Sequence, residues 1–253
     1  MGRTFRTVTP TSDDDFKIDL RSEVGVELVK HSAADSDVLF AARVSTVGEQ
    51  SLDEMGKDPE RSKGLINYLM RDRHGSPFEH NSMTFFISAP IFVFREFMRH
   101  RVGWSYNEES GRYRELQPVF YVPDTSRKLV QQGRPGKYVF VEGTPEQHDF
   151  VERAMEESYR QAYRTYQEML AAGVAREVAR AVLPVGLFSS MYATCNARSL
   201  MHFLGLRTQH ELAKVPSFPQ REIEMVGEKM EEQWAKLMPL TYSAFNANGR
   251  VAP

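Results

Sequence analysis

Residues 82–101 read SMTFFISAPIFVFREFMRHR and place a strand directly before a helix. The segment 82–88 is rich in residues that favour strands. Pro90 follows at a position where proline is tolerated, in the first turn of a helix that should run towards Arg101. The apolar face of this helix consists of Ile91, Phe94, Phe97 and Met98. Both element types in one stretch indicate a mixed fold.

Before this stretch, segments 16–20 and 24–29 alternate between apolar and polar residues, which is typical of strands. Helix-capping side chains follow them. Asp35, Ser36 and Asp37 should cap the helix that follows them. The elements we expect are a loose tail over 1–15, a hairpin of strands 16–20 and 24–29, a helix over 38–43, and a helix from 59 to about 74.

The chain after this stretch contains the longest helix that we predict. Thr144, Pro145 and Gln147 form a capping box with a first-turn proline, and the apolar spacing continues to Ala172. The other expected elements are a loop over 103–111, a strand over 119–122, a loop-like insertion over 127–143, helices over 176–183 and 197–206, a strand over 188–194 and a helix from 219.

Helices and strands do not alternate regularly, which favours an α+β class over repeated βαβ units. At 253 residues the chain is within the range of one large domain. We therefore expect a single domain over 1–253 with a mostly antiparallel sheet flanked by helices.

Composition limits the classes of partner. The 32 basic and 34 acidic side chains nearly balance, which argues against a polyanion-coating protein and against a nucleic-acid partner. The chain has neither a signal-peptide pattern nor an apolar run near the roughly 20 residues that span a bilayer. We expect a cytoplasmic protein without a membrane partner.

Cys195 is the single cysteine of the chain and excludes an internal disulfide and a multi-thiolate metal site. We interpret it as a buried thiol. His74 and His80 flank a proline turn, not one helical face, so we expect no metal. Any redox chemistry must therefore come from a bound cofactor.

A polar cluster begins at Arg99-His100-Arg101 and continues through residues 105–113. Basic side chains in the last turn of a helix are often solvated partners of its dipole. Arginine forks, a hydroxyl and glycine amides can instead hold a phosphate, while amides and carboxylates can read the edge of a base. The concentration of these groups favours a nucleotide site.

This cluster resembles the signature of the flavin-dependent thymidylate synthases (ThyX), an arginine-histidine-arginine triplet followed at a fixed distance by serine. Eight residues separate Arg101 from Ser110, where the familiar signature has seven, and Gly103-Trp104 is the expected site of the extra residue. The other blocks that carry the resemblance are 41–45 (AARVS), 74–80 (HGSPFEH), 89–93 (APIFV), 176–184 (REVARAVLP), 196–200 (NARSL) and 206–207 (LR).

The resemblance implies reductive methylation of dUMP to dTMP. It implies FAD as cofactor, NADPH and 5,10-methylenetetrahydrofolate as co-substrates, and a homotetramer with shared active sites. The implied FAD contacts are Ser76, Arg99, His100, Arg101, Glu108, Asn196, Ala197, Arg198 and His202. The implied dUMP contacts are Glu96, Phe97, Met98, Arg99, Glu108, Glu109, Ser110, Gly111, Arg112, Arg180 and Arg207, with Arg207 as catalytic activator of the uracil ring.

The chain departs from the family pattern at three further places. Glu96 stands where related sequences have glutamine, and His202 stands where an amide is more frequent. The segment 208–218 is longer than the usual link, which leaves a contact of His210 with FAD in doubt.

Structural roles remain open for several of these residues. Ser76 could serve only a turn, Asn196 could cap a helix, and Arg180 could pair with Glu177 on a surface. Two other functions also remain open: a non-catalytic nucleotide-binding or RNA-binding module that uses the same arginines, and a flavoenzyme for a different pyrimidine.

Overall fold

The computed structural model describes residues 17–48, 59–134 and 137–253, so the expected tail over 1–15 lies outside the described residues. Backbone contacts divide the chain into two compact units. Among the described residues, the first contains 17–23, 89–92, 109–134 and 137–189, and the second contains 24–48, 59–88, 93–108 and 190–253. The single domain over 1–253 stays a prediction. No helix in the described part of the chain is long and apolar enough to cross a membrane.

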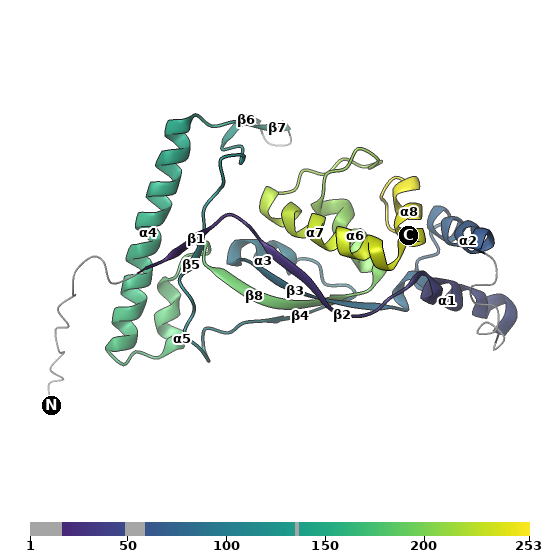
Figure 1. Ribbon diagram of the computed structural model, residues 1–253, viewed down its shortest axis with the longest axis horizontal. Coiled ribbons are helices and arrows are strands. Elements are labelled where there is room, and N and C mark those ends of the chain that lie inside the picture. The colour runs from purple at the N-terminus through teal and green to yellow at the C-terminus, as the bar shows by residue number, and fades with distance from the viewer. Residues whose placement is uncertain (1–16, 49–58, 135–136) are drawn as a thin grey trace. The chain divides into compact units, whose positions relative to one another are not determined.

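The first unit is organised around α4, Pro145–Ala171 (Figure 1). The capping box forms as predicted: Thr144 Oγ1 accepts from the Gln147 amide at 3.3 Å, and Gln147 Oε1 accepts from the Thr144 amide at 2.9 Å. Tyr159, Tyr163 and Tyr166 lie on its buried face at helical spacing. The longest predicted helix is thus confirmed.

The tyrosines of α4 pack against Phe120 on β5, Val119–Tyr121. The rings of Phe120 and Tyr159 stack with centroids 4.7 Å apart. β5 pairs in parallel with β1, Asp19–Arg21, so the predicted opening hairpin is wrong. Alternation along a strand reports which face is buried, but it does not identify the strand that lies alongside.

Two further elements of the first unit differ from the prediction. The expected loop over 127–143 contains an antiparallel hairpin of β6, Val130–Arg134, and β7, Lys137–Val141. Most of its side chains are exposed, so no alternation of buried residues marks it in the sequence. The expected helix over 176–183 is a short α5, Arg176–Ala179, followed by a 3₁₀ turn, Arg180–Val182.

A four-stranded sheet in the order β2-β3-β8-β4 forms the base of the second unit. β2 is Gly25–Ser32, β3 is Ser82–Pro90, β8 is Phe188–Cys195 and β4 is Trp104–Glu108. β2 pairs antiparallel with β3, and β4 pairs antiparallel with β8. The α+β class with a mostly antiparallel sheet is confirmed, whereas the loop expected over 103–111 is wrong because residues 104–108 form an edge strand.

The helices of the second unit are α1, Asp35–Val47, α2, Pro59–Arg71, α3, Ile91–Phe97, α6, Ala197–Arg207, α7, Arg221–Leu237, and α8, Pro239–Ala247, with a 3₁₀ turn at Ser76–Glu79. α3 ends four residues before Arg101, where we had expected it to end. α8 was not predicted.

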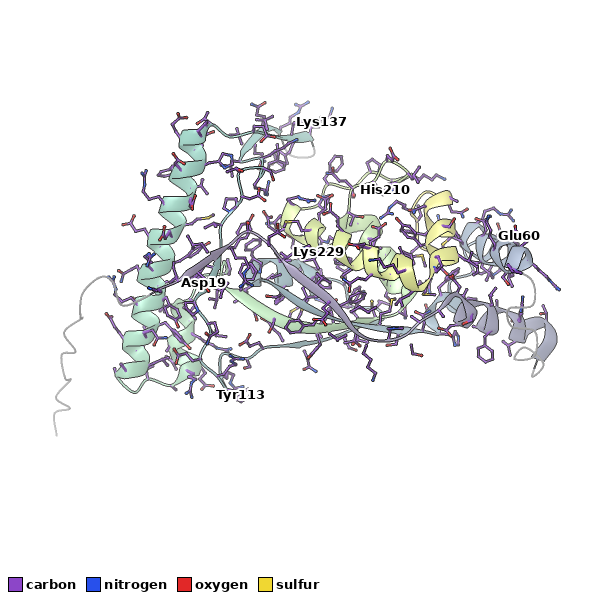
Figure 2. The ribbon with its side chains drawn as sticks, in the orientation of Figure 1. Asp19, Glu60, Tyr113, Lys137, His210 and Lys229 are labelled. Carbon is purple, nitrogen blue, oxygen red and sulfur yellow. The ribbon has the colours of Figure 1, made fainter. Side chains whose placement is uncertain are left out.

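Helix α7 lies along the edge strand β2, beside α6 (Figure 1). Lys229, which is labelled in Figure 2, donates from Nζ to the Val24 carbonyl at 2.8 Å. Gln233 accepts from the Leu28 amide at 2.6 Å and donates to the Val26 carbonyl at 3.2 Å. These side chains satisfy backbone groups that an edge strand would otherwise leave open.

Asp35 caps a helix other than its own. Its carboxylate accepts from the Leu240 amide at 2.8 Å, the Thr241 amide at 2.9 Å and the Thr241 hydroxyl at 2.6 Å, at the first turn of α8. Ala34 occupies the cap position of α1, and its amide donates to Asp37 at 2.8 Å. Asp35 therefore joins α1 to α8.

Candidate active site

Two asparagine side chains accept hydrogen bonds from backbone amides in the first turn of helix α6. Asn196 Oδ1 accepts from the Ser199 amide at 2.9 Å, so the helix-cap role of Asn196 is confirmed. Asn81 Oδ1 accepts from the Ala197 amide at 2.8 Å. Ala197 itself is fully buried. Among the described residues, the Asn196 side-chain nitrogen has no hydrogen-bond partner, so it remains a donor for a ligand.

Helix α6 ends at Arg207, whose guanidinium is held by two side chains of residues 91–100. Nη1 of Arg207 donates to Glu96 Oε2 at 2.5 Å, and Nε donates to His100 Nε2 at 3.1 Å. Both side chains of the ion pair are mostly buried, with 17% and 27% exposed for Arg207 and Glu96. Nη2 has no partner within the described part of the chain and is the free donor of the fork.

The imidazole of His100 is neutral. Burial first, then the positive charge of Arg207 and the neighbouring His202, lower the pKa of His100 from 6.5 to about 4. Because Nε2 accepts the hydrogen bond from Arg207, the ring proton must lie on Nδ1. Among the described residues, the carboxylate of Glu96 is the negative charge that contacts Arg207.

An aromatic cluster supports the turn that follows α3. Phe97 is fully buried, and its ring lies 4.5 Å from that of Phe203 and 5.4 Å from that of Trp104. The Tyr106 hydroxyl donates to the His100 carbonyl at 2.7 Å, and burial raises the pKa of Tyr106. Phe97 therefore presents no exposed surface to a nucleotide.

Arg198 lies in the first turn of α6 and is held on two sides. Nη1 donates to Glu79 at 2.5 Å, and Nε donates to the Pro253 backbone oxygen at 2.6 Å. A Cβ added to Gly75 would lie 2.5 Å from Cζ of Arg198, so only glycine allows this approach. Ser76 follows Gly75 and is exposed at the start of the 3₁₀ turn.

The two arginines of the Arg99-His100-Arg101 triplet are available to bind an anion. The guanidinium groups of Arg99 and Arg101 are exposed and make no hydrogen bond or ion pair with any described residue. His202 lies at the surface, where partial burial, Arg198 and Arg73 lower its pKa. Unpaired guanidinium groups, an exposed hydroxyl and a glycine approach fit the pyrophosphate of a dinucleotide such as FAD.

The remaining predicted contacts of dUMP lie in the first unit, apart from Met98 and Glu108, which belong to the second. Arg112 Nε donates to Glu177 at 3.0 Å, and Arg114 Nε donates to Glu109 at 3.2 Å. The surface partner of Glu177 is therefore Arg112, not Arg180.

Gly111 is buried, whereas residues 112–115 after it are exposed. A Cβ there would lie 2.8 Å from Leu116 Cδ1 and 3.2 Å from Arg180 Cδ, so Gly111 brings the backbone close to the stem of Arg180. Ser110 Oγ accepts from the Arg112 amide at 3.3 Å. Exposed ion pairs such as that of Arg112 contribute only about 0–1 kcal/mol, so a phosphate can replace the carboxylate at little cost.

No metal site is found among the described residues, since no three His, Cys, Asp or Glu side chains gather there. His74 stacks on Tyr68, with ring centroids 5.5 Å apart. Cys195 is fully buried, and burial raises the pKa of its thiol, so the interpretation as a buried thiol is confirmed.

The structure adds one feature that motif analysis did not assign. An open surface pocket of about 430 Å³ follows Arg207 along the chain and is lined by Gln209, His210, Glu211, Pro216, Ser217 and Phe218. His210 is labelled in Figure 2. The only signal in the sequence is the unusual length of 208–218.

Known proteins resemble the chain over almost all of its length. The family model described as thymidylate synthase complementing protein matches residues 27–240. A flavin-dependent thymidylate synthase of Streptomyces coelicolor is 87% identical over 97% of this chain and 100% of that protein. One of Tropheryma whipplei (strain TW08/27) is 59% identical over 92% of this chain and 96% of its own length.

A solved structure extends the comparison to three dimensions. The UMP/dUMP methylase PolB from Streptomyces cacaoi, bound with 5-Br dUMP, is 58% identical and has a TM-score of 0.89. The match covers 93% of this chain and 100% of that chain. At 58% identity the two proteins share most of their residues as well as their fold.

The contact between Arg207 and His100 predicts a titration that nuclear magnetic resonance of the imidazole can follow. His100 should titrate near pH 4, and Arg207→Gln should raise its pKa because a repelling positive charge is removed. Arg71→Gln, which removes an exposed arginine of α2, is the control and should leave His100 unchanged. An ordinary pKa in the parent protein, or no response to Arg207→Gln, would contradict the arrangement.

Proposed function

The chain belongs to the flavin-dependent thymidylate synthases, and from this premise we propose how its side chains serve the reaction. It is an enzyme that methylates dUMP with the help of a flavin. The geometry that carries the proposal is the Arg207 guanidinium, which Glu96 and a neutral His100 hold in place while Nη2 stays free. This group can donate a hydrogen bond to a pyrimidine carbonyl.

The co-substrates that we propose are 5,10-methylenetetrahydrofolate and NADPH, with FAD as the flavin. Methylation at C5 of uracil from a methylene-level folate requires one carbon and two electrons, and no amino-acid side chain donates a hydride. The chemistry that FAD would supply when bound is this hydride, and NADPH would supply the two electrons that the flavin needs. The family resemblance supports this choice of carbon and electron donors.

We place FAD on the cationic surface around the start of α6. Arg99, Arg101 and Arg198 would neutralise the pyrophosphate, because planar guanidinium forks match phosphate oxygens. The free Asn196 nitrogen and the Ser76 hydroxyl would add neutral hydrogen bonds. The remaining contacts that we propose are His100, Glu108, Ala197 and His202.

We place the phosphate of dUMP on Ser110, Gly111, Arg112 and Arg180. A hydroxyl, a backbone amide and two guanidinium groups form a complementary set for a dianion. Support comes from the weak surface pair of Arg112 and from the close approach of Gly111 to Arg180. The remaining contacts that we propose are Glu96, Phe97, Met98, Arg99, Glu108, Glu109 and Arg207.

Arg207 is the catalytic residue of this proposal. Negative charge develops on the uracil ring as C5 is methylated, and a pre-positioned guanidinium stabilises it without reorganisation. Neutral His100 accepts a hydrogen bond from Nε and Glu96 accepts one from Nη1, which leaves Nη2 as the donor for the pyrimidine. One donor aimed at such a charge contributes about 3 kcal/mol to transition-state stabilisation.

The direct test of the function is formation of dTMP. Purified protein should be yellow and should convert dUMP to dTMP with methylene-folate and NADPH, and omission of either co-substrate should stop turnover. A colourless protein that binds nucleotide without product would support a binding module. A yellow protein that leaves dUMP unchanged would support another flavoenzyme.

The role of Arg207 is tested by substitution in the same assay. Arg207→Ala should retain flavin but lose most dTMP formation, by about 100-fold if one transition-state donor is removed. Arg207→Lys should recover little, because a point charge does not reproduce a planar fork. Arg71→Gln serves as the control and should keep normal turnover. Near-normal activity of Arg207→Ala would remove this residue from the mechanism.

We propose that the enzyme acts in the cytoplasm as a homotetramer whose sites draw residues from more than one subunit. The family resemblance supports the assembly. The exposed guanidinium of Arg99, which has no partner among the described residues, supports a site that is completed by a ligand or a second copy of the chain.

Shared sites predict complementation between inactive chains. If Arg99 and Arg207 of one site come from different subunits, mixed tetramers of Arg99→Ala and Arg207→Ala chains should regain part of the activity. Native mass spectrometry would establish the mixing. Lasting inactivity in tetramers shown to be mixed would contradict the shared site.

A further inference from the structure

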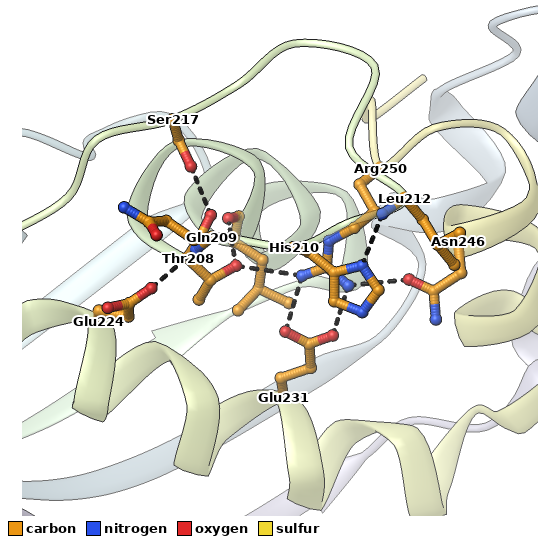
Figure 3. A network of polar contacts seen from close by, with 10 residues as sticks. Thr208, Gln209, His210, Leu212, Ser217, Glu224, Glu231, Asn246 and Arg250 are labelled. Atoms are coloured by element: carbon orange, nitrogen blue, oxygen red, sulfur yellow. Dashed lines mark hydrogen bonds and ion pairs between the residues drawn. The ribbon is translucent and has the colours of Figure 1, made fainter.

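A buried ion pair lies beside Thr208, the residue that caps the end of α6 (Figure 3). Nη1 and Nη2 of Arg250 donate to the two carboxylate oxygens of Glu231 on α7, at 2.6 and 2.7 Å. Nη1 also donates to Asn246 Oδ1 on α8 at 2.8 Å, and Nη2 to Thr208 Oγ1 at 3.1 Å. The side chains of Arg250 and Glu231 are only 1% and 12% exposed.

Thr208 connects this ion pair to Arg207, because the two residues are adjacent. The Thr208 hydroxyl also donates to the Leu204 carbonyl at 2.7 Å, one turn back in α6. A Cβ added to Gly227 of α7 would lie 2.7 Å from Thr208 Cγ2 and 3.7 Å from the Arg207 carbonyl oxygen. The backbone of residues 207–208 is therefore fixed between Gly227 and Arg250.

The backbone of Arg250 adopts a conformation that its side chain alone would not favour. Its φ is 56°, and that of the preceding Gly249 is 75°. A residue other than glycine rarely occupies this left-handed region, and such residues persist where the surroundings enforce them. The two left-handed residues reverse the chain after α8 and return the guanidinium of Arg250 between α7 and α8.

We propose that Arg250 and Thr208 are positioning residues that hold the backbone of Arg207, so that its guanidinium meets the pyrimidine at a fixed place. This inference rests on the proposed function. Glu96 and His100 fix the head of the Arg207 side chain, while Thr208 and Arg250 fix its base. With both ends held, a long side chain acts as a rigid donor.

The rival explanation is that the Arg250 network only stabilises the fold. Breaking a buried ion pair by removing one partner is strongly destabilising, so an Arg250 variant would lose activity under either explanation. Thr208 offers a milder change. Thr208→Val removes the hydroxyl but keeps a methyl group against Gly227, and Thr208→Ser restores the hydroxyl.

Thr241→Val is the matched control. Thr241 is fully buried in the same unit, and its hydroxyl also bonds to a charged side chain, the carboxylate of Asp35. Both valine variants should lower the urea midpoint of unfolding. Only Thr208→Val should lower kcat, roughly ten-fold, since displacements of about 1 Å at a reacting group are costly. Thr208→Ser should restore kcat.

A second readout needs neither flavin nor substrate. If Thr208→Val lets Arg207 move away from His100, the pKa of His100 should rise in an imidazole titration, whereas Thr241→Val should leave it unchanged. Asn246→Ala removes one acceptor of Arg250 and should shift His100 in the same direction by a smaller amount. It provides the test if Thr208→Val does not fold.

Equal effects of Thr208→Val and Thr241→Val on kcat, together with an unchanged His100, would overturn the proposal. An unchanged His100 in Asn246→Ala would do the same if Thr208→Val proves unstable. If the parent protein forms no dTMP, the proposed function fails, while the titration still decides whether Thr208 positions Arg207.

Discussion

Helix α6 is fixed at both ends, and the arrangement of charged side chains around it depends on this constraint. Asn196 and Asn81 satisfy amides at its first turn, and Thr208 satisfies a carbonyl at its last. Unsatisfied groups at helix ends would allow those turns to fray. Arg198 and Arg207 each lie within one turn of a fixed end, so their guanidinium groups have defined positions.

The two arginines differ in what surrounds them. Arg198 is partly exposed and forms an ion pair with the exposed Glu79. Because such a pair is weak, a ligand phosphate can replace the Glu79 carboxylate. Arg207 is mostly buried beside Glu96 and His100. Burial and the charge of Arg207 keep His100 neutral, so Nε2 of His100 can accept the hydrogen bond from Arg207.

The first unit contributes a different kind of surface. Its core of tyrosines and Phe120 supports an exposed segment whose ion pairs, such as Arg112 with Glu177, are weak and solvated. Weak pairs cost little free energy to break, so these arginines can exchange a carboxylate for another anion. The proposed site thus combines a rigid helix end with an exposed segment that carries arginines.

The sequence by itself determined the features that depend only on residues close together in the chain. The capping box of α4, the strand over 82–88 and the triplet Arg99-His100-Arg101 all lie within short windows, where periodicity and motif spacing are visible. The family followed from such windows, as did the α+β class.

Tertiary structure decided the partners. Nothing near Asp19 indicates that β1 pairs with β5, and nothing near Arg250 indicates an ion pair with Glu231 or a bond to Thr208. The polar residues of 104–108 are typical of a loop, and this segment forms a strand because it pairs with β8. These contacts join residues far apart in the chain, and their free energy depends on burial and pairing that exist only after folding.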